Sequence, residues 1–174
     1  MRNSRVLKLI AVFSVLGIFG AFAYLTRLTS PETQIKSYLA NMERVGSFEG
    51  EGLIGDQISY GSSIADFCSE PCRVVITRES GVSQLSLTRK EIVQRLIVVR
   101  QQLAQLGIVF LHPEISVRGS GATVVAEARG MGRSTGRDDY FLEVHKIKLD
   151  LVRDGKSWKV RRIENVDPLL DVDE

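Results

Sequence analysis

Two side chains that could carry out acid–base chemistry lie close together in the C-terminal part of the chain. Glu143 and His145 are two residues apart in a stretch with strand character, 140–153, so strict alternation places both on one face of the strand. That face continues with the apolar side chains of Phe141, Ile147, Leu149 and Leu151. A carboxylate and an imidazole among apolar neighbours are typical of a catalytic pocket, where burial moves pKa values toward the working pH.

A β-bulge gives a second interpretation of the same strand, and the sequence favours it. One extra residue at His145–Lys146 leaves an inner face that is apolar apart from one phenol, with Glu143 pointing to solvent. Such a bulge also supplies the bend that a strongly curved sheet requires. Glu143 and His145 are then only a weak candidate acid–base pair, and no catalytic residue is assigned. The candidate cavity lining consists of Tyr140, Leu142, Val144, Ile147 and Leu149.

An apolar segment near the N-terminus indicates where the protein resides. Residues 9–26 carry no charge and, at about 1.5 Å per residue, would make a helix long enough to cross the core of a bilayer. More positive charge precedes the segment than follows it, which predicts that residues 28–174 lie on the periplasmic side. Two alternatives remain open. The apolar run to Leu25 favours an uncleaved single-pass signal anchor in the cytoplasmic membrane, whereas cleavage after Ala23 would release the protein into the periplasm.

Export changes the interpretation of the two cysteines, Cys68 and Cys72, in the stretch CSEPC. Their spacing differs from the redox CxxC motif and from the paired ligands of a zinc site. In an oxidising compartment two cysteines this close most simply pair with each other, and Pro71 helps to bend the chain back. The sequence predicts a local disulfide, with free thiols and redox or metal chemistry as the alternatives. No metal site and no cofactor is assigned.

Three other features have structural interpretations. The stretch 129–139 holds three arginines and three glycines and could cradle an anion, but it matches neither nucleotide-binding glycine pattern and is predicted to be a hairpin loop. His112 is predicted to be a packed or edge residue and Trp158 a core anchor.

The charge distribution excludes nucleic acid as a partner. Four of the 23 basic residues fall in 1–27, which leaves 19 basic against 21 acidic residues in the remainder.

Helical spacing and caps predict two helices. The first begins at Ser30-Pro31-Glu32 and ends at Gly46, and the second begins with a capping box at Thr88–Glu91 and extends its apolar stripe to Leu106. The strands are expected at 73–77, 82–87, 108–117, 122–129, 140–153 and 158–166, the last four as an antiparallel meander. Region 47–72 has no clear pattern. The chain therefore divides into an N-terminal segment at 1–29, one α+β domain at 30–167, and an acidic tail at 168–174.

The order of these elements, with the stretches GSGATVVAEARG (119–130) and LDLVRDGKSWKVRRIE (149–164), resembles the NTF2-like superfamily and its SnoaL-like and ketosteroid-isomerase-like branches. The resemblance implies a curved antiparallel sheet that forms a cone-shaped roll with the helices. Some members of the family are acid–base enzymes and others are binding or assembly modules, so the fold does not decide the function. The family's catalytic positions do not match residues of this chain.

The sequence therefore favours a non-enzymatic, membrane-tethered accessory, assembly or binding module of the bacterial cell envelope. A homodimer or an envelope protein is the expected partner. The alternative is an exported SnoaL-like enzyme, or a carrier of a small apolar ligand, that uses the cone cavity.

Overall fold

The structure is a computed structural model that describes residues 30–50, 52–136 and 139–167. The predicted anchor or signal segment and the acidic tail lie outside these residues. Within the described ranges, none of the helices combines the length and the apolar character that a membrane crossing needs.

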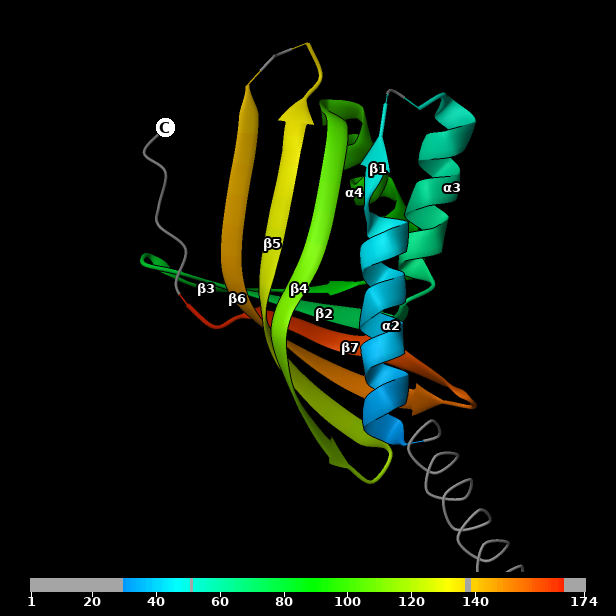
Figure 1. Cartoon of the computed structure of the whole chain (residues 1–174), viewed down its shortest axis with the longest axis vertical. Helices are drawn as coiled ribbons and strands as arrows, with labels where there is room; N and C mark the ends of the chain where they lie inside the picture. The colour runs from blue at the N-terminus through cyan, green and yellow to red at the C-terminus, as the bar shows by residue number, and fades with distance from the viewer. Residues whose placement is uncertain (1–29, 51, 137–138, 168–174) are drawn as a thin grey trace, which may run out of the picture.

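The described residues form an α+β unit of three helices and a single curved sheet (Figure 1). The helices are α2 (Pro31–Gly46), α3 (Ile54–Ala65) and α4 (Arg89–Gln102). The strands are β1 (Phe48–Glu49), β2 (Cys68–Arg78), β3 (Gly81–Leu87), β4 (Leu103–Arg118), β5 (Gly121–Ser134), β6 (Tyr140–Asp154) and β7 (Ser157–Asn165). Their order in the sheet is β1-β4-β5-β6-β7-β2-β3.

The four long strands are consecutive antiparallel neighbours, which confirms the predicted meander. Strand β7 then pairs in parallel with β2, so the short hairpin β2–β3 extends the same sheet. This parallel pairing joins segments about ninety residues apart, and no local pattern in the sequence predicts it.

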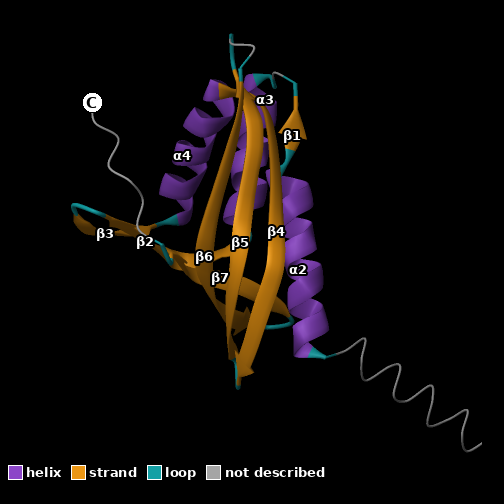
Figure 2. Cartoon of the chain, turned by 60° about the vertical axis from the view of Figure 1, so that its left-hand side comes forward, coloured by secondary structure: helices purple, strands orange, loops and turns teal. Residues whose placement is uncertain are grey.

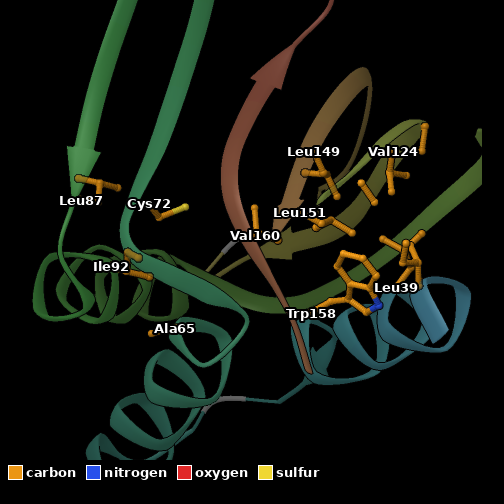
Figure 3. Close-up of a cluster of buried hydrophobic side chains, with 13 residues drawn as sticks. Leu39, Ala65, Cys72, Leu87, Ile92, Val124, Leu149, Leu151, Trp158 and Val160 are labelled. Atoms are coloured by element: carbon orange, nitrogen blue, oxygen red, sulfur yellow. The ribbon is translucent and has the colours of Figure 1, made fainter. Parts of the chain in front are cut away.

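The helices lie on one face of the long strands (Figure 2). The core lies between the helices and this face. Buried side chains reach it from α2, β5, β6 and β7, as Figure 3 shows for Leu39, Val124, Leu149 and Val160. Each large apolar side chain buried here contributes about 1.5–3 kcal/mol. Trp158 belongs to the same cluster at 4% exposure, which confirms its predicted role as a core anchor. We call the helix-covered face of the sheet the inner face and the opposite one the outer face.

Helix α2 begins and ends where the sequence predicts. The Ser30 side chain accepts a hydrogen bond from the backbone N–H of Thr33 at 3.2 Å, and Pro31 occupies the first turn. Ile35 and Leu39, one turn apart, are both buried against the sheet. The helix therefore presents its apolar stripe to the inner face.

Helix α4 has the predicted capping box but ends earlier than predicted. Thr88 and Glu91 cap each other's backbone N–H groups at its start. Leu103 is already extended, and Leu106 pairs with Phe48 of β1 on one side and with Gly132 of β5 on the other. The prediction that the helix continues to Leu106 is wrong because pairing on both sides satisfies the backbone better than one further helical turn.

A buried arginine fixes the end of α4. Arg100 is 7% exposed and donates hydrogen bonds to the carbonyl oxygens of Gly50, at 2.6 Å, and Leu103, at 3.2 Å. Its guanidinium lies 3.8 Å from the centroid of the Phe48 ring. Carbonyl oxygens and an aromatic face stabilise this cation away from water. Arg100 thereby joins the end of α4 to β1.

Region 47–72, for which the sequence gives no clear pattern, contains β1, α3 and the start of β2. The N-terminus of α3 has only half of a capping box, because Leu53 at the N-cap has no side-chain acceptor while its backbone N–H donates to Asp56 Oδ2 at 3.0 Å. Gly61 lets α3 approach α4 closely, since a Cβ there would lie 3.1 Å from the carbonyl oxygen of Val93. The helix is held by packing against α4 more than by its own pattern.

The long strands bend at a β-bulge in β4. Two residues of β4, His112 and Pro113, face one residue of β5, and His112 has a φ of 50°, in the left-handed region that non-glycine residues rarely adopt. Strand β6, in contrast, pairs with β5 without interruption from 140 to 152. The predicted bulge at His145–Lys146 is therefore wrong. The bend falls in the neighbouring strand, where Pro113 could not have donated a ladder hydrogen bond.

Candidate functional site

Glu143 and His145 both lie on the inner face of the sheet. The unbroken register pairs Glu143 with Gly130 and His145 with Ala128. Alternation along β6 then puts both side chains on the face of Leu149, which is 2% exposed. Side chains along β6 thus alternate strictly between the two faces, although the sequence pattern favoured a bulge at His145–Lys146.

The two side chains form a close pair that remains open to water. Glu143 Oε2 lies 3.2 Å from His145 Nε2, and the side chains are 63% and 43% exposed, respectively. A histidine held by a carboxylate can accept and donate protons. Acid–base catalysis, however, requires groups held away from bulk water. In the single chain this pair therefore has the geometry of an acid–base site without its burial.

Small residues on β5 leave the surface beside the pair shallow. The residues opposite Phe141, Glu143 and His145 are Gly132, Gly130 and Ala128. A Cβ at Gly132 would lie 2.4 Å from the Gln105 carbonyl oxygen and 2.6 Å from the Phe141 ring, so only glycine fits there. A Cβ at Gly130 would meet nothing within 4 Å, which leaves space next to Glu143.

Three members of the predicted cavity lining lie on the outer face instead. Tyr140, Leu142 and Val144 are 72%, 59% and 46% exposed. Ile147 and Leu149, from the same prediction, do lie on the inner face, because the unbroken register separates the two groups. Tyr140, Leu142 and Val144 adjoin two further exposed apolar side chains on β4 and β5. We call the five residues the outer apolar patch: Val109, Met131, Tyr140, Leu142 and Val144.

Cys68 and Cys72 are neighbouring free thiols in the structure. The hydrogen bond from the Cys72 thiol lowers the pKa of Cys68, and the same bond together with burial raises the pKa of Cys72. The register between β2 and β7 shifts between Cys68 and Arg73, so the CSEPC stretch is an irregular step in the strand. The two sulfurs are close, as a local disulfide requires, and the disulfide stays a prediction.

A groove that the sequence analysis did not identify separates α2 from the β6–β7 hairpin. It has a volume of about 820 Å³, and we call it the α2 groove. Tyr38 and Trp158 contribute aromatic surface, and Tyr38 Oη donates a hydrogen bond of 2.6 Å to the carbonyl oxygen of Phe67. Burial raises the pKa of Tyr38, so this hydroxyl stays protonated. One sequence signal does mark the groove, because basic residues cluster around the single tryptophan in RDGKSWK.

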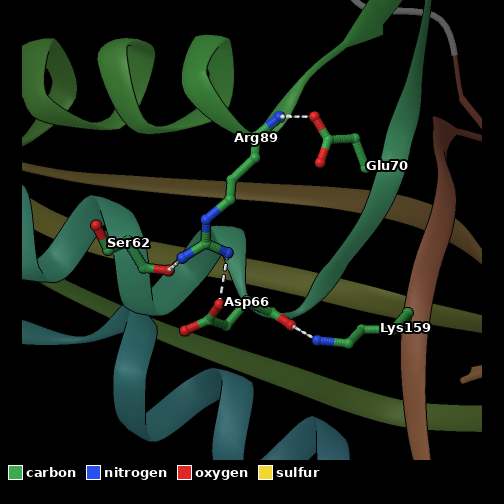
Figure 4. A network of polar contacts seen from close by, with 5 residues as sticks. All are labelled: Ser62, Asp66, Glu70, Arg89 and Lys159. Atoms are coloured by element: carbon green, nitrogen blue, oxygen red, sulfur yellow. Dashed lines mark hydrogen bonds and ion pairs between the residues drawn. The ribbon is translucent and has the colours of Figure 1, made fainter. Parts of the chain in front are cut away.

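Polar contacts fix the wall of the α2 groove that Asp66 forms (Figure 4). The Asp66 carboxylate accepts a hydrogen bond from Arg89 at 2.5 Å, and its backbone carbonyl accepts one from Lys159. Arg89 also contacts the Ser62 carbonyl, at 3.4 Å. The only carboxylate lining this groove is therefore already paired, among the residues that the structure describes.

The arginine- and glycine-rich stretch is mostly strand. Strand β5 continues to Ser134, so Arg129 and Arg133 are strand residues, and they alternate with Gly130 and Gly132. The prediction of a hairpin loop over 129–139 is wrong for 129–134, because these residues pair with β4 and β6. His112 is exposed at the bulge on β4.

Across 30–50, 52–136 and 139–167, no group of three or more His, Cys, Asp or Glu side chains has a geometry that could hold a metal ion. Besides the α2 groove, smaller grooves of about 410 Å³ and 140 Å³ lie near Asp150 on the outer face and near Arg100. Neither of them includes Glu143 or His145.

No protein-family model and no curated protein matches this sequence. Solved structures do match the arrangement of its helices and strands. One is an NTF2-like protein with a cystatin-like fold from Novosphingobium aromaticivorans, with a TM-score of 0.59 and 16% identity over 83% of this chain and 86% of that one. The chain has an NTF2-like fold.

Two further neighbours show how varied this fold is. A candidate scytalone dehydratase from Novosphingobium aromaticivorans has a TM-score of 0.57 and 14% identity over 83% of this chain and 86% of its own. ActVI-ORFA from Streptomyces coelicolor has a TM-score of 0.55 and 13% identity over 78% of this chain and 95% of its own. At these identities the likeness shows the NTF2-like fold and assigns no reaction.

Proposed function

We propose that the protein is a non-enzymatic NTF2-like assembly module of the cell envelope. Residues 9–26 tether it to the cytoplasmic membrane, with the domain on the periplasmic side. It binds a protein partner through the outer apolar patch, and that partner is a second copy of the chain.

The outer apolar patch carries this proposal. Its five side chains lie on the outer face of three adjacent strands, where Met131 pairs with Leu142 and the Arg129 position separates Val109 from Val144. Exposed apolar side chains gathered on one face mark protein contacts. Glu127 and Lys146, which are cross-strand neighbours, stand at its border with opposite charges. In a two-fold arrangement the border of one copy can pair with that of the other, since such an interface brings the same surface of both copies together.

The inner face supports a structural role for the domain. Side chains from α2 and the long strands fill the space between this helix and the sheet, where Ile35, Val124 and Leu151 have at most 1% exposure. The ionisable pair, Glu143 and His145, stays in contact with water. A filled cone and an exposed pair fit a scaffold better than an enzyme.

One observation favours a second candidate, an exported SnoaL-like enzyme or a carrier of a small apolar ligand. The 3.2 Å contact of Glu143 with His145 lies on the inner face, beside the open space at Gly130. A ligand or a second chain that covered this pair would give it the burial that acid–base chemistry needs. Binding of an apolar fluorescent probe to wild-type protein, and loss of this binding in Gly130→Leu, where the leucine side chain fills the space, would support this candidate.

Chemical crosslinking in intact membranes tests the assembly proposal. Wild-type protein should give a covalent dimer, and Leu142→Glu should abolish it, because a carboxylate at the centre of the patch would lose its hydration when the two copies meet. Val82→Glu is the matched control, since Val82 is an exposed strand valine on β3, at 69% exposure, outside the patch. A Leu142→Glu variant that crosslinks like wild type would refute this use of the patch.

A further inference from the structure

The α2 groove combines positive charge with an aromatic floor. Arg153, Lys156 and Lys159, all from the β6–β7 hairpin, line it. The guanidinium of Arg153 lies 5.8 Å from the Trp158 ring centroid, which holds this cation over the floor. The indole N–H of Trp158 is buried and has no hydrogen-bond partner among the described residues. The hairpin wall thus offers three cations beside an aromatic floor.

The opposite wall of the groove also offers hydrogen-bond donors. Ser37 and Asn41 line the groove from the middle turns of α2, where the Asn41 side-chain oxygen accepts a hydrogen bond from Arg44 at 2.6 Å and its amide N–H groups are left to donate. Nearby carboxylates are engaged, because Glu32 pairs with Lys36 at 2.8 Å and Asp66 pairs with Arg89. Asp154, in the hairpin turn, is the exception and does not line the groove. This chemistry fits an anionic group, such as a phosphate, with an apolar body beside it.

The length of the chain before α2 places this groove close to the proposed membrane. Thr26 ends the apolar segment and Pro31 begins α2, so five residues at about 3.5 Å each limit their separation to roughly 17 Å. Ser37 follows Pro31 by about 9 Å along the helix. A tether this short keeps the α2 groove within reach of the lipid headgroups.

We propose that the α2 groove binds the headgroup of an anionic phospholipid in the membrane that anchors the chain. The lipid phosphate meets Lys156, Lys159 and Arg153, and the start of its glycerol and acyl region lies against Tyr38 and Trp158. This inference rests on the proposed tether. It adds that the domain holds a fixed orientation on an anionic membrane, since the hairpin and the start of α2 contact the lipid together.

Lysine acetylation followed by mass spectrometry tests this binding in the full-length chain. The protein is reconstituted into phosphatidylcholine vesicles with or without phosphatidylglycerol. Lys156, which is exposed in the structure, should react at least about fivefold more slowly when phosphatidylglycerol is present, and high salt should restore its rate. Lys90 is the internal control. It is exposed on the first turn of α4, outside both the α2 groove and the outer apolar patch, and its rate should not change.

Variants separate the groove from general surface charge. Lys156→Gln should remove the protection of Lys159 by phosphatidylglycerol, and Lys156→Arg should keep it. Equal loss of protection in Lys90→Gln would refute the groove, because it would show that total charge alone governs the effect.

Four outcomes decide the inference. Protection of Lys156 that requires phosphatidylglycerol supports it. Protein that resists carbonate washing but shows no lipid dependence refutes the headgroup site and leaves the tether standing. Equal protection by inorganic phosphate in phosphatidylcholine vesicles refutes the lipid as the ligand and assigns the site to a free phosphate. Protein that carbonate removes from the vesicles refutes the tether, and this inference falls with it.

Discussion

Arg100 gives the sharpest test of how α4 is joined to the sheet. Its guanidinium donates to the carbonyl oxygens of Gly50 and Leu103 and lies over the Phe48 ring. Hydrogen bonds from a charged donor contribute about 1.5–3 kcal/mol each, and the ring contact contributes about 0.5–2 kcal/mol. Part of this sum offsets the cost of removing the guanidinium from water. We expect Arg100→Met to lower the free energy of unfolding by about 2–4 kcal/mol, because two part-buried hydrogen bonds from a charged donor are lost.

Urea denaturation followed by Trp158 fluorescence measures this change, since Trp158 is the only tryptophan in the chain. Arg95→Met is the matched control. Arg95 is exposed on the same helix, so its replacement should change the free energy of unfolding by less than about 0.5 kcal/mol. Equal effects of the two substitutions would refute the view that Arg100 joins α4 to β1.

Three other predictions follow from the described residues and the sequence. Glu143→Gln should change the free energy of unfolding by less than about 0.5 kcal/mol, whereas Leu149→Ala on the same face should lower it by about 2–5 kcal/mol; equal losses in urea denaturation would contradict the exposure of Glu143. In reduced protein, iodoacetamide at mildly alkaline pH should modify Cys68 before Cys72, because the lowered pKa of Cys68 favours its thiolate. Protein purified without reductant should show no free thiol on denaturing alkylation, and alkylation of both cysteines would contradict the disulfide. The full-length protein should stay in the membrane pellet after carbonate washing, and a soluble product that begins at Tyr24 would establish cleavage instead.

Features encoded by neighbouring residues could be predicted from the sequence. The cap at Ser30 and the capping box at Thr88 depend on side chains within three positions of the groups that they satisfy. The hairpin turn at Gly155, with a φ of 58°, likewise needs only its own glycine. These local signals located both helix starts and the order of the four long strands.

Features set by distant partners could not be predicted. Leu103 to Leu106 fit the helical stripe equally well, and only their pairing with β1 and β5 makes them strand. The bend of the sheet could have fallen in any long strand. An apolar pattern in β6 suggested His145–Lys146, but His112–Pro113 of β4 took the bulge. The error in register placed three apolar side chains on the wrong face and concealed the outer apolar patch.

The candidate site likewise combines features that neighbouring residues encode with features that distant partners set. The sequence identified Glu143 and His145 as neighbours because they are two residues apart on one strand. It could not show how exposed they are, since that depends on how far the helices cover the inner face. The α2 groove was missed because its walls come from segments more than a hundred residues apart, the first turns of α2 and the β6–β7 hairpin.

The two proposed contact surfaces lie at opposite ends of the long strands, which makes them compatible in one molecule. The α2 groove lies at the β6–β7 turn, and Leu142, in the outer apolar patch, lies twelve residues earlier on β6. At about 3.3 Å per residue this is up to about 40 Å along the strand, well beyond the depth of a headgroup layer. A domain held to lipid at the groove would therefore keep the outer apolar patch clear of the membrane. The patch would then be available to a second tethered copy, whose own short linker confines it to the same surface and raises its effective concentration.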